Sequence, residues 1–277
     1  MTHGGAAAIN AAVLAAVNPG DRVVIPEPTY LYPDAVRLAG GEPVLVPTTS
    51  DHRLDLDALA DALRGARMIV LCNPVNPTGT VFNGDELGAL GALLDGTDVL
   101  VLADEAYAEI VYDGVPFTSA LAVESLRERL IYCQTLSKTY AMTGWRVGYV
   151  VAPVEMTAPI RHVHRTFNSA LNAAAQRAAI TALRLGPELA APMLRAYQER
   201  RDLVAKRLAE MDEVEAIKPE GAFYAFARYR CALRSEDVVQ RLLAGGVAVR
   251  AGSEYGPSGK ATSGSPSPPT SIRSTKD

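Results

Sequence analysis

The sequence has little of what marks several classes of protein. Its 277 residues include three cysteines and four histidines, and its lysines and arginines are scattered along the chain. Without a basic block, it carries no footprint for nucleic acid or for a membrane surface. No apolar run approaches the roughly 18 residues that a membrane helix needs, and the first residues lack the charged and apolar regions of a signal peptide. We therefore expect a cytoplasmic protein that binds neither nucleic acid nor membrane.

The cysteines and histidines form no disulfide or metal pattern. Cys72, Cys133 and Cys231 are widely spaced, and two of them lie inside apolar runs, which is typical of buried thiols. His162 and His164 have no third ligand near them in the sequence, so we expect no metal site. A solvated face of a helix is the better interpretation for both.

What the sequence does contain, up to about residue 152, is an alternation of short apolar runs and amphipathic stretches. Continuously apolar strands are typical of parallel sheets that helices cover on both faces. Asn83, followed by Gly84 and Asp85, is a plausible helix start. The pattern predicts an α/β domain. We expect strands at 22–25, 43–46, 68–72, 99–102, 130–133 and 147–152, with helices at 54–63 and 85–94.

The second half of the chain predicts a smaller α+β domain. An Ala-rich stretch at 172–183 favours a helix. Further elements are expected as helices at 187–211 and 236–244 and as strands at 222–226 and 247–249. We divide the chain into a large domain, 1–170, an incomplete small domain, 171–260, and a segment rich in Ser, Pro and Thr, 261–277, that we expect to be disordered.

One lysine has surroundings suited to chemistry. Lys138 lies in Thr-Leu-Ser-Lys-Thr-Tyr, directly after an apolar strand, where partial desolvation favours the neutral amine that forms a Schiff base. Thr135, Ser137 and Arg146 offer two hydroxyls and a guanidinium, which are donors that hold a phosphate dianion. The alternative is a surface lysine in a polar turn, and the flanking residues argue against it.

Two more polar segments follow apolar strands. Asp104, in Ala-Asp-Glu-Ala-Tyr, stands at the carboxyl end of a strand, where open α/β sheets bind ligands; a helix cap is the alternative. Residues 73–79 read Asn-Pro-Val-Asn-Pro-Thr-Gly, and a plain loop is their default interpretation. The Asn76–Pro77 bond is a candidate for the cis form, which the sequence leaves open.

Two features near the N-terminus are ambiguous when taken alone. Gly4 and Gly5 precede an Ala-rich helix, and backbone N–H groups at a helix start bind phosphate. A simple turn is the ordinary interpretation of such a pair. Tyr30 is either a core tyrosine near a turn or an aromatic side chain that stacks on a ligand ring.

Together these segments resemble the class I and II aminotransferases, which are fold-type I enzymes that use pyridoxal phosphate. The segment around Lys138 is similar to the family's lysine motif, Ser-[Leu/Phe/Tyr]-Ser-Lys followed eight residues later by Arg and then Val-Gly, with Thr135 where Ser is common. Residues 73–79 match the family's N-P-x-N-P-T-G loop, and the first residues, Met1-Thr2-His3-Gly4, resemble its V-T-x-G loop. The resemblance covers roughly residues 2–260.

The resemblance implies a fold, a cofactor and a reaction. The fold is a mostly parallel sheet sandwiched by helices, with a smaller C-terminal α+β domain. The cofactor is pyridoxal 5'-phosphate, and the reaction moves an amino group between an amino acid and a 2-oxo acid through a Schiff base on Lys138. The resemblance also implies a homodimer.

The same resemblance gives each site residue a role. It implies that Asp104 pairs with the pyridine nitrogen of the cofactor and that Lys138, once freed by substrate, is the general base. Tyr107 and Asn76 would contact the phenolic oxygen, and Tyr30 would stack on the ring. The phosphate would lie against Gly5, Ala6, Thr135, Ser137 and Arg146.

Both ends of the chain depart from the family pattern, so we interpret it as truncated at both. The family has a substantial segment before its V-T-x-G loop, and this chain begins at that loop. Met1 stands where the family often has Val, so a GTG valine codon taken as a start is our hypothesis. After the position of Lys260 the family continues with His-Ile-Arg-Leu-Ser-Phe-Ala, whose Arg clamps the α-carboxylate of the substrate.

The segment 261–277 fits a single-base frameshift. GC-rich codons for Lys-Gly-His-Ile-Arg-Leu-Ser-Phe give Lys-Ala-Thr-Ser-Gly-Ser-Pro-Ser when one G is deleted, and that is the sequence from Lys260 onward. We therefore predict a frameshift near codon 261, in the gene or in its sequencing, with a genuine Ser/Pro linker as the alternative. Arg273 lies in this segment and is not assigned the clamping role, so substrate binding should weaken.

Three functions stay open at this point. The first is an active aminotransferase. The second is a truncated, catalytically impaired remnant that binds pyridoxal phosphate. The third is a lyase or synthase on the same fold, because cofactor motifs do not fix the reaction. The sequence does not determine which amino acid and oxo acid are the substrates.

Overall fold

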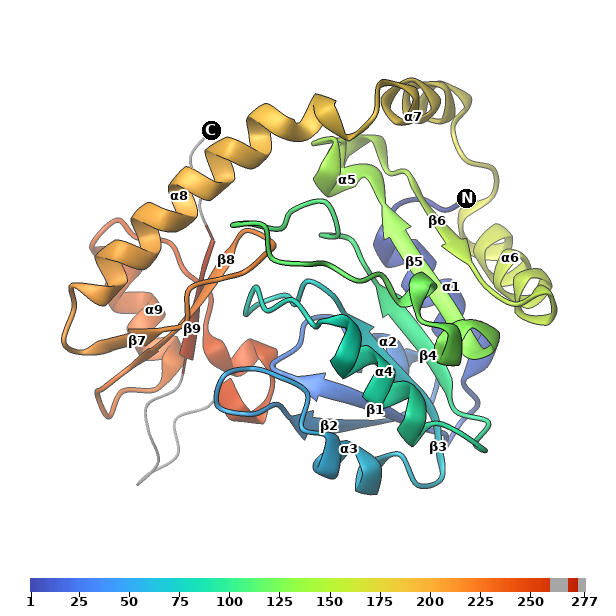
Figure 1. Ribbon diagram of the computed structural model, residues 1–277, viewed down its shortest axis with the longest axis horizontal. Helices are drawn as coiled ribbons and strands as arrows, with labels where there is room; N and C mark the ends of the chain where they lie inside the picture. The colour runs from blue at the N-terminus through green and yellow to red at the C-terminus, as the bar shows by residue number, and fades with distance from the viewer. Residues whose placement is uncertain (260–268, 274–277) are drawn as a thin grey trace.

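The computed structural model describes residues 1–259 and 269–273. Within them, two sheets lie side by side and a long helix runs from one to the other (Figure 1). The six-stranded sheet has the order β2-β1-β3-β4-β5-β6 and the three-stranded sheet the order β7-β8-β9. The strands are β1 (Arg22–Glu27), β2 (Glu42–Pro47), β3 (Ala66–Cys72), β4 (Leu100–Asp104), β5 (Leu130–Thr135), β6 (Gly148–Val151), β7 (Val214–Ala216), β8 (Tyr224–Tyr229) and β9 (Pro269–Arg273).

The α-helices vary from one turn to five. They are α1 (Gly5–Ala16), α2 (Tyr32–Leu38), α3 (Leu56–Ala62), α4 (Gly84–Leu93), α5 (Leu136–Thr139), α6 (Val154–Asn168), α7 (Ala173–Leu185), α8 (Ala191–Ala209) and α9 (Ser235–Ala244). In the part of the chain that the structure describes, we find no helix with both the length and the apolar character to cross a membrane.

Helices cover both faces of the large sheet, as the continuously apolar strands predict. Alternate residues of β3 show this arrangement: Met68 and Val70 pack in the layer that contains α1, α2 and α6, whereas Ile69 and Leu71 pack in the layer that contains α3 and α4. All pairs in this sheet are parallel except β5 with β6. The predicted fold, a mostly parallel α/β sheet sandwiched by helices, is confirmed.

Local sequence explains where two of the covering helices begin. Asn83 accepts a hydrogen bond from the Glu86 N–H at 2.9 Å, and Glu86 accepts one from the Asn83 N–H at 3.0 Å, which together form a capping box at the start of α4. Asp55 caps α3 through the Ala58 N–H at 3.0 Å. The helix start expected at Asn83 is therefore confirmed.

Several other expectations need correction. The stretch 247–249, expected as a strand, is irregular, because two glycines end α9 and the chain then runs into the turn at Gly252–Tyr255. The expected helix at 187–211 is divided into a 3-10 turn, Pro187–Ala190, and α8. Helices α2 and α5 were not expected, since each is short and adjoins a polar turn.

The predicted disorder of 261–277 is wrong for one part of that segment. Residues Pro269–Arg273 form β9, which pairs antiparallel with β8 from Tyr224 opposite Arg273 to Arg228 opposite Pro269. Free edge groups of β8 find backbone partners in this way. The rest of the segment, with codon 261, lies outside the described residues, so the frameshift stays a prediction. The domain boundary at residue 170 also stays a prediction; α7 packs on Leu136, Met142 and Val147 from the large-sheet side.

We expect the central strand β4 to control stability. Leu102 has no exposed surface and packs in the layer of α1, α2 and α6, so Leu102→Ala should lower the free energy of unfolding by about 2–5 kcal/mol through lost burial and an unfilled cavity. Denaturant titration measures this difference. Leu203→Ala is the matched control, because Leu203 on α8 is 56% exposed and its truncation should change stability by less than about 0.5 kcal/mol. Equal effects at the two positions would contradict this assignment of the core.

Candidate active site

A cavity of about 250 Å³ opens at the carboxyl ends of β3, β4 and β5 and at the N-terminus of α1. Every residue predicted for the site lines it, although the residues come from segments spread over more than half of the chain. They are Gly5, Ala6, Tyr30, Asn76, Asp104, Tyr107, Thr135, Ser137, Lys138 and Arg146. The structure therefore brings the whole predicted set together.

Lys138 lies on the single turn α5, directly after β5. The side chain of Thr135 caps this turn by accepting the Ser137 N–H at 3.2 Å. The Lys138 Nζ lies 5.9 Å from the ring centroid of Tyr107 and 5.5 Å from that of Phe223. Lysine is half-buried here, with its amine beside two aromatic rings and close enough to Asp104 to act on its charge.

Asp104 ends β4 and is 7% exposed. Its Oδ2 accepts a hydrogen bond from the Tyr32 hydroxyl at 2.8 Å, and its Oδ1 accepts one from the Ala106 N–H at 3.1 Å. Burial raises the pKa of the Asp104 carboxyl, while the Tyr32 hydroxyl, the Ala106 N–H and the Lys138 charge act in the opposite direction. A cationic N–H placed against this carboxylate would add to the forces that keep it ionised.

One end of the cavity is built to hold an anion. Helix α1 begins there, and the first N–H groups of a helix are free to bind a phosphate. The hydroxyls of Thr135 and Ser137 lie 2.9 Å apart beside it. The Arg146 guanidinium is held by the Thr143 carbonyl at 3.0 Å and by the His3 carbonyl at 3.4 Å.

Glycine is required where Arg146 meets the start of α1. Gly4 has a φ of 81°, and a Cβ there would lie 2.6 Å from the Arg146 Nη2. Both the left-handed backbone and the close approach exclude a larger residue without a shift of the guanidinium. The glycine therefore lets the charged group lie against the helix terminus.

The middle of the cavity contains unused hydrogen-bonding capacity. The Asn76 Oδ1 is buried and has no hydrogen-bond partner among the described residues, which suggests a ligand, because buried polar atoms are nearly always paired. Tyr107 donates to or accepts from the Tyr224 hydroxyl at 2.6 Å. Burial raises the pKa of Tyr107 well above its usual value, so its hydroxyl keeps its proton.

Tyr30 occupies the mouth of the cavity. It is 36% exposed, its ring centroid lies 5.8 Å from that of Tyr255 with the rings tilted by 43°, and the Arg250 guanidinium lies 5.8 Å from its centroid. The neighbouring Thr29 N–H donates to the Tyr255 carbonyl at 2.8 Å. One face of the cavity is thus closed by an aromatic ring, as the prediction of a stacking residue requires.

The donor set fits pyridoxal 5'-phosphate. The cavity offers an anion cradle for the phosphate, an aromatic wall for the ring face and a buried carboxylate for the ring nitrogen. The Asn76 amide and the Tyr107 hydroxyl suit the phenolic oxygen, and the Lys138 amine suits the aldehyde.

Comparison with known proteins agrees with this geometry. The family described as aminotransferase class I and II matches residues 1–268. The chain belongs to this aminotransferase family. The putative aminotransferase YugH of Bacillus subtilis (strain 168) is 39% identical over 266 residues, which is 94% of this chain and 68% of that protein.

Other relatives of this aminotransferase-family chain are named for an activity or have a solved structure. The bifunctional aspartate aminotransferase and glutamate/aspartate-prephenate aminotransferase of Petunia hybrida is 36% identical over 234 residues, or 82% of this chain and 49% of that protein. The aromatic aminotransferase from Pyrococcus horikoshii OT3 superposes with a TM-score of 0.91 at 33% identity, covering 98% of this chain and 73% of that one. This chain thus spans about half to two thirds of the length of the curated relatives.

Three residues of this aminotransferase-family site were not predicted from the sequence. Tyr32 bonds to Asp104, Tyr224 bonds to Tyr107, and Phe223 faces Lys138. Tyr224 and Phe223 lie in the stretch 222–226 that was interpreted only as a strand, and Tyr32 is two residues from Tyr30. A polar aromatic at a strand end was the available signal, but its partner lies far away in the sequence.

The interpretation of His164 as a solvated residue is wrong. His164 is 6% exposed, because α6 packs against α1 and encloses it. Its Nε2 lies 3.2 Å from the His3 Nδ1 and accepts the His3 N–H at 3.2 Å. The two rings stack with centroids 5.2 Å apart. Across residues 1–259 and 269–273 we find no group of side chains able to hold a metal ion.

Glu105, the neighbour of Asp104, should make stability depend on pH. It is 1% exposed, and burial raises its pKa from 4.5 to about 7, while the Ala120 N–H, 2.6 Å from Oε1, opposes the rise. Between these pH values the unfolded chain loses a proton that the folded chain keeps, so stability falls as pH rises. Glu105→Gln should remove a loss on the order of 3 kcal/mol.

Denaturant titration from pH 4.5 to 8 measures the effect of Glu105. The gap in unfolding free energy between the variant and the parent should change steadily up to about pH 7, in favour of the variant, and then stay constant. Glu128→Gln, at an exposed position, is the control and should give a constant gap. A constant gap for Glu105→Gln would refute the raised pKa.

Proposed function

We propose that this chain forms the active site of a pyridoxal-phosphate-dependent aminotransferase that exchanges an amino group between an amino acid and a 2-oxo acid. One observation supports this most strongly. A single cavity joins a lysine amine, a buried carboxylate and an anion cradle, contributed by segments that are far apart in the sequence. Family membership agrees with the reaction class, and the contacts of this chain's own residues suggest how the work is divided.

The residues of the cavity would hold the cofactor at both ends. The start of α1 with Gly5 and Ala6, together with Thr135, Ser137 and Arg146, would bind the phosphate, and Tyr30 would lie against the ring face. Lys138 would hold the aldehyde covalently in the resting enzyme. When bound, pyridoxal phosphate would supply an electron-withdrawing ring that stabilises negative charge on the α-carbon of the substrate.

Lys138 moves the proton. The amino group of the substrate would release Nζ from the cofactor. The free Nζ would then act as the general base that takes the proton from the substrate α-carbon and passes it to the aldehyde-derived carbon of the cofactor. The rings of Tyr107 and Phe223, at 5.9 and 5.5 Å from Nζ, keep water from the amine and limit its directions of approach. Exclusion of water prevents the proton from being lost to solvent.

Asp104 controls the charge of the ring. Its carboxylate, fixed by Tyr32 and by the Ala106 N–H, would pair with the ring nitrogen of the cofactor and hold a proton on it. Because burial alone raises the pKa of this carboxyl, the cationic nitrogen and the two hydrogen bonds are needed to keep it ionised. Tyr107 and Asn76 would contact the phenolic oxygen, with the Asn76 amide N–H as the donor, and both side chains line the same cavity.

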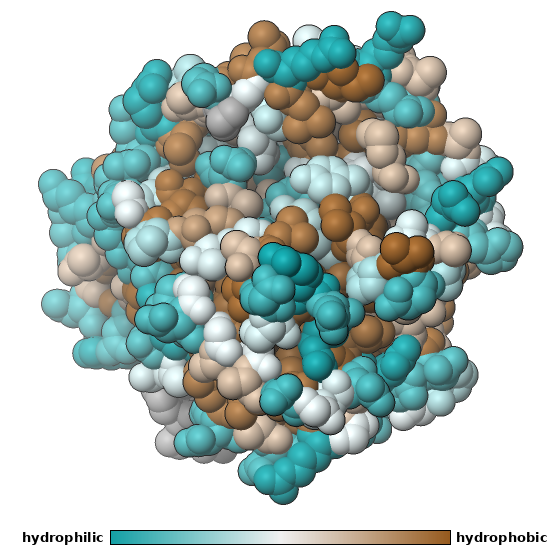
Figure 2. Space-filling model, turned by 45° about the vertical axis from the view of Figure 1, so that its right-hand side comes forward, coloured by the Kyte–Doolittle hydropathy of each residue, from teal (hydrophilic) through white to brown (hydrophobic). Residues whose placement is uncertain are grey.

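We also propose a cytoplasmic homodimer. A second hollow of about 500 Å³, lined by residues of α1, α2 and α6, shares Ala6 and Arg146 with the cofactor cavity. Leu38 and Phe167 at its rim are 77% and 73% exposed. Figure 2 shows that apolar patches interrupt the charged surface on the side that carries α6 and α7. Burial of such patches against a second copy would support a dimer, which light scattering tests.

The first test of the function is the reconstitution of the purified chain with pyridoxal 5'-phosphate. A visible absorbance band from the lysine-linked cofactor is expected, followed by amino transfer from one member of an amino-acid panel to a 2-oxo acid. A band without amino transfer would favour the binding remnant, and elimination or condensation products would favour a lyase or synthase. The absence of a band would reject all three.

Lys138→Ala should abolish the visible band and lower the transamination rate by at least about 10³-fold, because the covalent hold and the proton carrier are both lost. Absorbance and a coupled assay measure the two effects. Lys206→Ala, at an exposed position of α8, is the control and should match the parent. A Lys138→Ala protein that keeps the band would contradict the assignment.

Asp104→Asn should leave the fold and the phosphate contacts in place while lowering turnover by about 10²-fold or more, because a neutral amide does not hold the ring proton. Because asparagine has nearly the same shape as aspartate but no charge, this variant separates the effect of charge from that of packing. Turnover measured at saturating cofactor tests this expectation, and turnover equal to that of the parent would remove Asp104 from the mechanism.

A further inference from the structure

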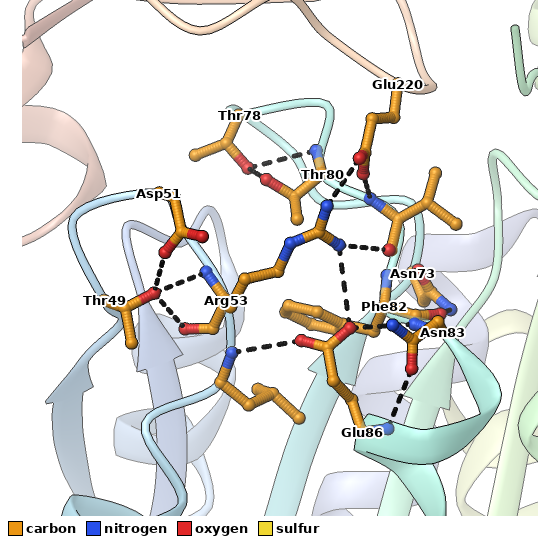
Figure 3. Close-up of polar contacts among 12 residues, drawn as sticks. Thr49, Asp51, Arg53, Asn73, Thr78, Thr80, Phe82, Asn83, Glu86 and Glu220 are labelled. Carbon is orange, nitrogen blue, oxygen red and sulfur yellow. Dashed lines mark hydrogen bonds and ion pairs between the residues drawn. The ribbon is translucent and has the colours of Figure 1, made fainter. Parts of the chain in front are cut away.

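The loop that carries Asn76 is held by the segment that leads into β8 of the small sheet. This loop, residues 73–83, connects β3 to α4, and its residues 79–81 contact the segment just before β8, which carries Glu220 (Figure 3). Inside the loop, the Gly79 N–H donates to the Val75 carbonyl and the Val75 N–H donates to the Thr80 carbonyl, each at 2.8 Å. The turn around Asn76 is therefore closed at residues 79 and 80, where the foreign segment meets it.

Arg53 and Glu220 both form hydrogen bonds to the backbone of Val81. The Val81 N–H donates to the Glu220 Oε2 at 2.9 Å, and the Val81 carbonyl accepts from the Arg53 Nη1 at 2.7 Å. Arg53 and Glu220 also form an ion pair with each other. Their side chains are 31% and 28% exposed, so this pair is shielded from water more than an ordinary surface pair is.

Backbone hydrogen bonds also join the two segments. The Glu220 and Gly221 N–H groups both donate to the Gly79 carbonyl, at 3.0 and 2.7 Å. A Cβ on Gly79 would lie 2.5 Å from the Pro219 Cβ, and one on Gly221 would lie 2.8 Å from the Pro74 Cγ. Only glycine permits this approach without a shift of backbone, so Gly79 and Gly221 allow the two segments to meet.

Residues 219–221 lead directly to residues at the cavity. Two residues after Gly221 come Phe223, whose ring lies beside the Lys138 Nζ, and then Tyr224, whose hydroxyl bonds to Tyr107. The Ala222 N–H donates to the Ile110 carbonyl at 2.9 Å, and the Tyr112 N–H donates to the Glu220 carbonyl at 2.9 Å. The position of residues 219–224 is thus shared by the Asn76 loop on one side and the Tyr107 segment on the other.

We propose that Arg53 and Glu220 are positioning residues that act through Val81 to hold Asn76 against the phenolic oxygen of the cofactor. This inference rests on the proposed function and extends it to two residues outside the cavity, since neither lines it. Loss of the Glu220 carboxylate leaves the Val81 N–H and the Arg53 guanidinium without their shared partner. The loop is then released at its closing turn, and Asn76 loses its fixed distance from the ring.

A pH titration of the visible band of the reconstituted protein tests the proposal. An N–H donated by Asn76 to the ring oxygen stabilises its ionised form, so loss of that contact raises the pKa of the bound cofactor. Asn76→Ala should raise this pKa by about half a unit or more. Glu220→Ala should shift it in the same direction, and Glu220→Gln should stay close to the parent, because the amide oxygen still accepts the Val81 N–H.

A double variant separates positioning from a general loosening. If Glu220 acts through Asn76, the Asn76→Ala/Glu220→Ala protein titrates with the pKa of Asn76→Ala alone. Additive shifts would overturn the proposal. Glu215→Ala is the matched control: it breaks an exposed ion pair with Arg230 between β7 and β8, away from the Asn76 loop, and should leave the titration unchanged.

Arg53→Gln keeps the proposal testable if Glu220→Ala does not fold. It removes the Arg53 contacts but leaves the bond from Val81 to Glu220, so it should raise the pKa of the bound cofactor by less than Asn76→Ala does. A titration of Arg53→Gln identical to that of the parent overturns the inference while leaving the proposed function intact, and so does an unchanged titration of a folded Glu220→Ala protein. Absence of the visible band in the parent protein rejects the proposed function and the inference together.

Discussion

The register of three neighbouring parallel strands is the constraint on which the site depends. Cys72 at the end of β3 lies opposite Asp104 of β4, and Asp104 lies opposite Cys133 of β5. Each strand therefore stops at the same edge of the sheet. The Asn76 loop, the Asp104–Tyr107 segment and the Lys138 turn all leave from that edge, so they meet although they are separated along the chain. A shift of one residue in any of these pairings would turn the side chains to the opposite face.

The same alternation separates two adjacent acids. Asp104 bonds to Tyr32 in the layer of α1 and α2, whereas Glu105 bonds to the backbone of Ala120 in the layer of α3 and α4. Both carboxyls are buried, and burial raises the pKa of each. Asp104 gains two hydrogen bonds and a nearby lysine, which support its charge. Glu105 Oε2 has no hydrogen-bond partner among the described residues, and burial raises the pKa of Glu105 to about 7, so its charged form gains less support than that of Asp104.

The small sheet contributes to the site because its residues contact side chains and loops that the large sheet carries. Its strand β8 brings Tyr224 to Tyr107, and the segment before it packs on Gly79 and pairs with Arg53. The long helix α8 carries the chain from the large sheet to this strand (Figure 1). Arg201 on α8 is buried and bonds to the Pro219 carbonyl at 2.7 Å and to Asp113 at 3.0 Å. The segment that closes the cavity is thus held on both sides, by the Asn76 loop and by α8.

The sequence by itself determined the strands of the large sheet, the α/β class and the polar surroundings of Lys138, whereas its resemblance to a family named the other residues of the cavity. These features are local: apolar runs of strand length, turn residues after them and a lysine among hydroxyls follow from nearest neighbours along the chain. Tertiary structure alone decided the partners that fix those residues. Tyr32 meets Asp104 across 72 positions, Tyr224 meets Tyr107 across 117, and Glu220 meets Arg53 across 167. Such pairs arise only when strand register and the packing of the small sheet set two side chains at bonding distance, and no local pattern encodes that distance.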